Sequence, residues 1–118
     1  MALVAVTAIG AALLAYRSGL PSDMADGTYA SECCIVELRG GDLVANGVDL
    51  VRYSVQQDDQ GPYILPGTFV GTEDGGIVLD GGRRVNKLRL DRLPNPTRIS
   101  IPGLWGPERF VRTARRAR

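Results

Sequence analysis

Two adjacent cysteines, Cys33 and Cys34, carry the most reactive side chains in this sequence of 118 residues. A thiol becomes a nucleophile or a redox group when a neighbouring base or cation lowers its pKa. The sequence has no histidine, and the first arginine after the pair is Arg39. Because successive side chains leave a strand on opposite faces, we expect one buried and one exposed cysteine, both reduced. The alternatives are a redox or nucleophilic thiol and, if the chain is exported, an intermolecular disulfide.

Acidic residues gather in turns, at Asp58-Asp59, Glu73-Asp74 and Asp80, just ahead of glycines. Clustered carboxylates could bind Ca²⁺, which takes about six to eight oxygen ligands, but no spacing here matches an EF-hand loop. Aspartate before glycine is ordinary turn chemistry. With no histidine to act as a general base, we predict no enzyme, and no catalytic, cofactor-binding or metal-binding residue.

Basic residues form a second group of candidates, for binding rather than for chemistry. Such clusters attract anionic lipid or an acidic protein surface. Nucleic acid is an unlikely partner, because the aromatic stacking platform of single-strand binders is missing. The candidate interaction residues are Arg83, Arg84, Lys87, Arg112, Arg115, Arg116 and Arg118.

Charge is distributed unevenly along the chain, although the net charge is only +1. Residues 20–80 hold eleven acidic and two basic residues, whereas residues 81–118 hold eleven basic and two acidic residues. We expect the two halves to pair across the sheet. The alternative is a dipolar surface that steers a charged partner.

Short alternating segments separated by Gly, Asp and Pro turns predict an all-β fold. The clearest begins after the hairpin signal Asn46-Gly47 and runs to Gln57. Seven to eight short strands at roughly ten-residue spacing predict a small antiparallel meander barrel or a sandwich. Leu104-Trp105 should pack on the core or at a barrel mouth. The residues predicted to share one core are Val51, Tyr53, Val55, Leu88, Leu90, Ile99 and Ile101.

Four regions follow from this pattern. Residues 1–17 contain an uncharged apolar run, predicted to be a helix that acts as a signal peptide or membrane anchor. This run is short for a spanning helix, which needs about 20 residues, so packing on a protein partner is a third alternative. Residues 18–27 are a linker, 28–111 the β domain and 112–118 a basic tail.

The expected function is that of a non-enzymatic, membrane-tethered or exported small β-barrel. It would act as a protein-binding or structural accessory module at the periplasmic or secreted face of a bacterial envelope. Its partner would be a protein in or at a membrane, with anionic lipid as a second candidate. The alternative is a lipocalin-like carrier of a small apolar ligand. A filled interior would favour the first function, and an open apolar cavity the second.

Overall fold

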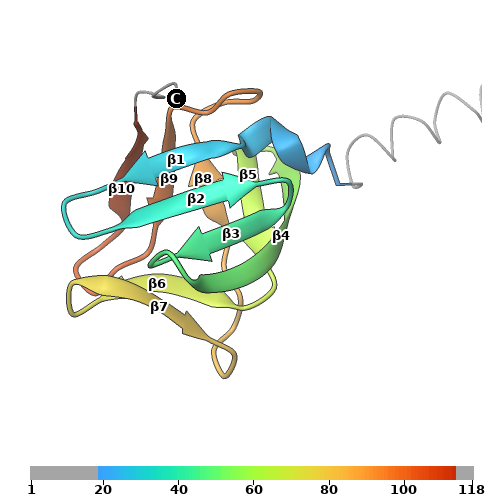
Figure 1. The fold of residues 1–118 in the computed structure, drawn as a ribbon. Helices are drawn as coiled ribbons and strands as arrows, with labels where there is room; N and C mark the ends of the chain where they lie inside the picture. Colours follow the sequence, from blue (N-terminus) through green and yellow to red (C-terminus); the bar gives the residue numbers. More distant parts are fainter. Residues whose placement is uncertain (1–18, 114–118) are drawn as a thin grey trace, which may run out of the picture.

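A computed structural model describes residues 19–113 of the chain (Figure 1). The helix predicted within residues 1–17 and the tail arginines Arg115, Arg116 and Arg118 lie outside the described residues. Residues 19–113 contain no helix that is long and apolar enough to cross a membrane.

Eight antiparallel strands form a closed barrel in the order β1-β10-β9-β8-β5-β4-β3-β2. Each strand pairs with its sequence neighbour, except that the β6–β7 hairpin is inserted between β5 and β8. The predicted all-β meander is therefore confirmed, and its strands form a barrel and not a sandwich. The barrel strands are β1 (Gly27–Ala30), β2 (Ile35–Arg39), β3 (Asp42–Ala45), β4 (Asp49–Asp58), β5 (Gly61–Pro66), β8 (Leu88–Leu90), β9 (Arg98–Ile101) and β10 (Glu108–Arg112). The inserted hairpin is β6 (Phe69–Glu73) and β7 (Gly76–Asp80).

Tight turns with positive φ connect the hairpins, as the glycine pattern predicts. Gly40 and Gly41 join β2 to β3 with φ values of 57° and 95°. Asp74 and Gly75 join β6 to β7 with φ values of 53° and 77°. These left-handed conformations suit glycine and, among other residues, aspartate and asparagine.

The interior of the barrel is filled by aliphatic and aromatic side chains. Of the seven residues predicted to share a core, six are buried and belong to one hydrophobic cluster, and Val51 is half-buried against it. The largest fully buried side chains, Tyr29 and Phe110, come from β1 and β10, where the barrel closes. The period of two along each strand thus identifies the core correctly.

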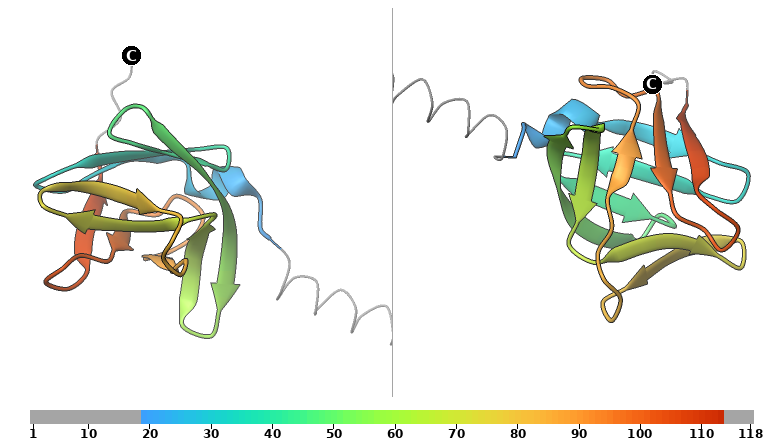
Figure 2. Two further views of the ribbon diagram at one scale, coloured as in Figure 1. Left: turned by 90° about the horizontal axis from the view of Figure 1, so that it is seen from below. Right: turned by 180° about the vertical axis from the view of Figure 1, so that it is seen from behind.

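Different elements cover the two ends of the barrel (Figure 2). We call the first the helix end: it carries the 3₁₀ helix η1 (Ser22–Ala25) and the β8–β9 loop, joined by a hydrogen bond from Asn95 N to Met24 O of 3.1 Å. At the second, the hairpin end, β6 and β7 lie across the barrel with Val70 and Ile77 in the core. The turns 31–34 and 46–48 and the loop 102–107 share this end.

Both ends of the described chain lie at the helix end. Leu20 N donates to Val55 O at 2.8 Å just before η1, and Thr113 N donates to Thr28 O at 2.8 Å at the start of β1. Figure 1 shows η1 on the side of the barrel away from the β6–β7 hairpin.

Candidate functional site at the hairpin end

The sulfurs of Cys33 and Cys34 are bonded to each other, so the expectation of two free thiols is wrong. That expectation placed both cysteines on a strand. In the structure β2 begins only at Ile35, and the pair lies in the turn that follows β1. Side chains in a turn need not leave on opposite faces, so neighbouring sulfurs can meet.

The two sulfurs differ in their surroundings. Cys33 is exposed, and Ser31 Oγ lies 3.5 Å from its sulfur and accepts a hydrogen bond from Cys33 N at 3.3 Å. Cys34 is buried, and its sulfur lies 3.8 Å from the carbonyl oxygen of Gly75 in the β6–β7 turn. A disulfide sulfur carries no proton, so the contact with Gly75 holds no hydrogen bond in this state.

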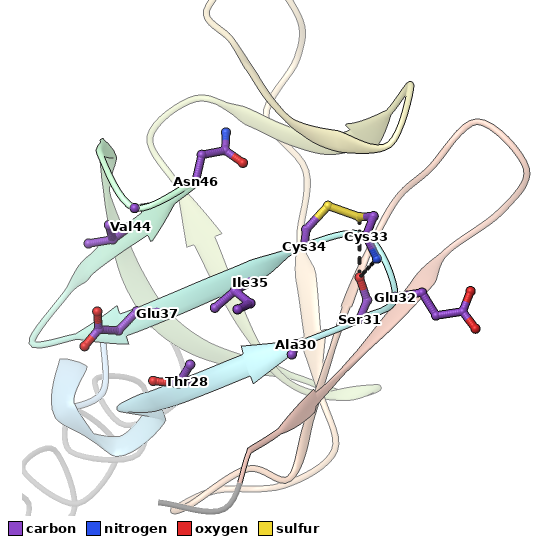
Figure 3. Close-up of a pocket in the computed structure, with 11 residues that line it drawn as sticks. Thr28, Ala30, Ser31, Glu32, Cys33, Cys34, Ile35, Glu37, Val44 and Asn46 are labelled. Carbon is purple, nitrogen blue, oxygen red and sulfur yellow. Dashed lines mark hydrogen bonds between the residues drawn. A yellow bond between two sulfur atoms is a disulfide. The ribbon is translucent and has the colours of Figure 1, made fainter. Parts of the chain in front are cut away.

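Two surface depressions flank the disulfide. The first, about 590 Å³, lies on the outer face of β1, β2 and β3, where Ala30, Ile35 and Val44 form an apolar floor (Figure 3). The second, about 510 Å³, lies between Cys33, the β6–β7 turn and the β9–β10 loop. Cys33 lines both depressions and so lies between them.

Large apolar side chains project from the hairpin end into solvent. Trp105, the sole tryptophan of the chain, is 98% exposed, and Leu104 beside it is 62% exposed. Both were expected to pack on the core or at a barrel mouth, and they lie at one end of the barrel without packing against it. Instead, Gly103 and Gly106 exchange backbone hydrogen bonds of 3.0 and 3.3 Å, which close a tight turn with the two side chains outside it. Val48, at the tip of the β3–β4 turn, is also exposed.

Carboxylates surround these apolar groups. Glu32, Asp74 and Glu108 line the two depressions, and within residues 19–113 none of the three takes part in an ion pair. Glu73 differs, because its ion pair with Arg83 lowers its pKa. The hairpin end therefore presents three carboxylates around an apolar centre, while Lys87 and Arg89, which pair with Asp58, line a neighbouring depression beside Gly103. The turn signals in the sequence locate Asp74 but neither Glu32 nor Glu108.

The basic residues singled out from the sequence do not form one surface. Arg83 is bound by Glu73 and Asp80, and its guanidinium lies 4.7 Å from the centre of the Phe69 ring. Lys87 pairs with Asp58 at 2.8 Å. These ion pairs join the acidic and basic halves of the sequence, as expected. Arg84 is exposed in the segment between β7 and β8.

Arg112 belongs to β10 and to the barrel, not to a tail. Its guanidinium donates to Tyr29 Oη at 3.1 Å, to Pro96 O at 2.9 Å and to Asp26 O at 2.7 Å. A Cβ at Gly27 would lie 2.8 Å from the guanidinium carbon, so glycine leaves room for it. Burial raises the pKa of Tyr29 to about 12, which keeps this hydroxyl neutral. Arg112 is therefore unavailable to a partner.

The hairpin end thus brings together a disulfide, three exposed apolar side chains and three carboxylates from segments far apart in sequence. Comparison with models of protein families, with curated proteins and with solved structures gave no significant match for this chain.

Proposed function

We propose that this chain is a membrane-tethered β-barrel that acts as a non-enzymatic protein-binding module of a bacterial envelope. Its helix end faces the membrane and its hairpin end faces a protein partner. The observation that carries the proposal is the position of the chain ends. Leu20 and Thr113, near the two ends of the described chain, are held at the helix end, whereas Trp105 lies beside the β6–β7 turn at the hairpin end.

The tether follows from what adjoins those chain ends in the sequence. An uncharged apolar run, residues 2–16, precedes Gly19, and Arg115, Arg116 and Arg118 follow Thr113. An apolar anchor and a basic segment act together on an anionic bilayer, because a single weak anchor binds reversibly. Each basic residue near such a surface contributes about 1 kcal/mol.

A protein is the occupant that best fits the hairpin end. Leu104 and Trp105 offer the aromatic and aliphatic anchors that are frequent in protein interfaces. The same side chains could enter a bilayer, but Asp74 and Glu108 beside them would be repelled by anionic lipid. A partner segment that presents basic residues around an apolar patch complements both features.

The packed interior favours protein binding over the carriage of an apolar ligand. A cavity able to hold a ligand would leave accessible surface on the side chains around it. Val55, Ile64, Ile99 and Phe110, from four different barrel strands, have an accessible surface of 0%. The β6–β7 hairpin also covers the end at which an open barrel would admit a ligand.

The proposal is tested by photo-crosslinking in native membranes. The full-length chain carries a crosslinking amino acid either at Leu104 or at Val111, an apolar residue on the outer face of β10 that is 49% exposed. We expect a specific protein adduct from position 104, reduced by Trp105→Ser, and little from position 111. Equal adducts from both positions, or lipid adducts alone from position 104, would contradict the proposal.

A further inference from the structure

We propose that the Cys33–Cys34 disulfide is a thiol–disulfide exchange site, which captures a cysteine thiol of a basic protein segment through the sulfur of Cys33. The inference concerns the hairpin end alone and does not depend on the membrane tether. It rests on the different exposure of the two cysteines, on the contact between Cys34 and Gly75, and on the surrounding carboxylates.

Access selects the sulfur that is attacked. A thiolate must approach one sulfur of a disulfide while the other leaves, so the exposed sulfur reacts. Cys33 is exposed and lines both depressions, whereas Cys34 lines only the first, is 7% exposed and lies against Gly75 of the β6–β7 turn. An incoming thiolate can therefore reach Cys33.

The exchange takes place in two steps. The partner thiolate forms a bond to Cys33 Sγ, the Cys33–Cys34 bond breaks, and its electron pair leaves on Cys34 Sγ, which takes a proton from water. A second thiol of the partner can then attack the partner's own sulfur in the mixed disulfide. Cys33 leaves as a thiolate and takes up a proton, so both cysteines are reduced. Over both steps the pair gains two electrons and two protons, and the partner dithiol is oxidised to a disulfide.

A hydrogen-bond acceptor lies next to the sulfur that leaves. Gly75 O lies 3.8 Å from Cys34 Sγ and accepts no hydrogen bond from it while the disulfide is intact. Once Cys34 carries a proton, its thiol can donate to this carbonyl, a contact within the usual range for sulfur. The mixed-disulfide state therefore gains a link between the β1–β2 turn and the β6–β7 turn.

The carboxylates at this end determine which thiols approach. Glu32 is the neighbour of Cys33 in sequence, and Asp74 and Glu108 line the second depression together with Cys33. Their negative potential concentrates cationic thiols at the site and repels anionic ones. The substrate class is therefore a cysteine flanked by basic residues, in keeping with the acidic and apolar character of the docking surface.

Mass spectrometry tests the site of attack. The full-length oxidised protein is mixed with an excess of a peptide whose one cysteine is flanked by arginines. The reaction is then quenched with acid, and the free thiols are alkylated. We expect the peptide on Cys33 and the alkyl group on Cys34. Attachment of the peptide to Cys34, or alkylation of both cysteines before any thiol is added, would overturn the proposal.

Single-cysteine variants provide a matched control. Cys34→Ser leaves the exposed thiol and Cys33→Ser the buried one, and 4,4′-dithiodipyridine measures the reactivity of each in protein whose circular dichroism is native. We expect Cys34→Ser to react about tenfold faster or more, because buried thiols are protected. Similar rates would contradict selection by access. If either variant fails to fold, the peptide-mapping result on the unaltered chain decides.

A charge variant tests the substrate class. Rates of exchange are compared for two peptides that differ only in having arginines or glutamates beside the cysteine. In the triple variant Glu32→Gln, Asp74→Asn and Glu108→Gln, the preference for the arginine peptide should fall about three- to tenfold at low salt. High salt should reduce the preference of the wild type in the same way. An unchanged ratio in the variant would refute selection by charge.

Discussion

Arg112 donates a hydrogen bond to the hydroxyl oxygen of Tyr29 across the seam at which the first and last strands of the barrel meet. Tyr29 in turn donates to Ala25 O of η1 at 2.8 Å. The guanidinium thus ties β10, β1 and the 3₁₀ helix together at the helix end.

Replacing Arg112 by Met should therefore destabilise the fold. The variant loses three hydrogen bonds from a charged donor and leaves Pro96 O and Asp26 O unsatisfied. We expect a loss of about 2–4 kcal/mol in the free energy of unfolding, measured by urea denaturation. Arg109→Met, an exposed position on the same strand, is the control and should change stability by less than about 0.5 kcal/mol. Equal losses in the two variants would show that Arg112 has no special role.

Two leucines that differ in burial test the assignment of the core. Leu90 is 6% exposed and packs in the barrel, whereas Leu104 projects from the hairpin end. Leu90→Ala should cost about 2–5 kcal/mol, because it removes buried methyl groups and leaves a cavity. Leu104→Ala should leave the urea midpoint nearly unchanged. A substantial loss for Leu104→Ala would mean that its side chain packs against the protein.

Asp58 should make the stability depend on pH in the acid range. Hydrogen bonds from Arg89 and then from Lys87 hold the pKa of Asp58 well below its usual range. As the pH falls below about 4, the unfolded chain takes up this proton before the folded barrel does. The stabilising contribution is therefore present above about pH 4 and is lost as the pH falls toward the lower, folded-state pKa.

The measurement is urea denaturation at several pH values between about 2 and 6. Asp58→Asn should flatten the decline in stability at acid pH relative to the wild type. Asp59→Asn, at the exposed neighbouring position, should keep the wild-type slope. If Asp58→Asn declines as steeply as the wild type, the ion pairs of Asp58 do not contribute to acid sensitivity.

The tail arginines should strengthen binding of the full-length chain to anionic vesicles. Changing Arg115, Arg116 and Arg118 to Ser removes three charges from the segment that follows Thr113 in the sequence. Co-sedimentation with anionic vesicles should weaken at low salt, and the difference from wild type should shrink at high salt. Arg84→Ser, at an exposed position between β7 and β8, is the control for loss of charge. Equal binding by wild type and tail variant would remove this role of the tail.

Alternation along each strand predicts most of the fold. Leu88, Leu90, Ile99 and Ile101 read as inward residues because their neighbours are polar, and all four are buried. The β6–β7 hairpin shows the limit of this signal. The turn residues Asp74-Gly75-Gly76 separate β6 and β7 as two short strands, but nothing in the sequence states whether a strand joins the barrel wall or lies across its end.

The candidate site is less predictable, because its parts meet only through long-range packing. Cys34 and Gly75 are 41 positions apart in the sequence and touch because the hairpin folds over the β1–β2 turn. The sequence predicts that Trp105 packs on the core or at a barrel mouth, and its exposure depends on a local turn closed by Gly103 and Gly106. Arg112 is the opposite case. Its position among other arginines predicts a residue of a basic tail, whereas in the structure it holds elements of the barrel together.

The orientation of the barrel on the membrane is tested most directly by the fluorescence of Trp105, the sole tryptophan. Full-length protein is bound to anionic vesicles, with binding verified by flotation, and is exposed to quenchers in water or attached to lipid chains. The proposed orientation predicts strong quenching by aqueous acrylamide and none by brominated acyl chains, because the hairpin end faces away from the bilayer. Quenching by brominated lipid with protection from acrylamide, or failure of the protein to float with the vesicles, would contradict it.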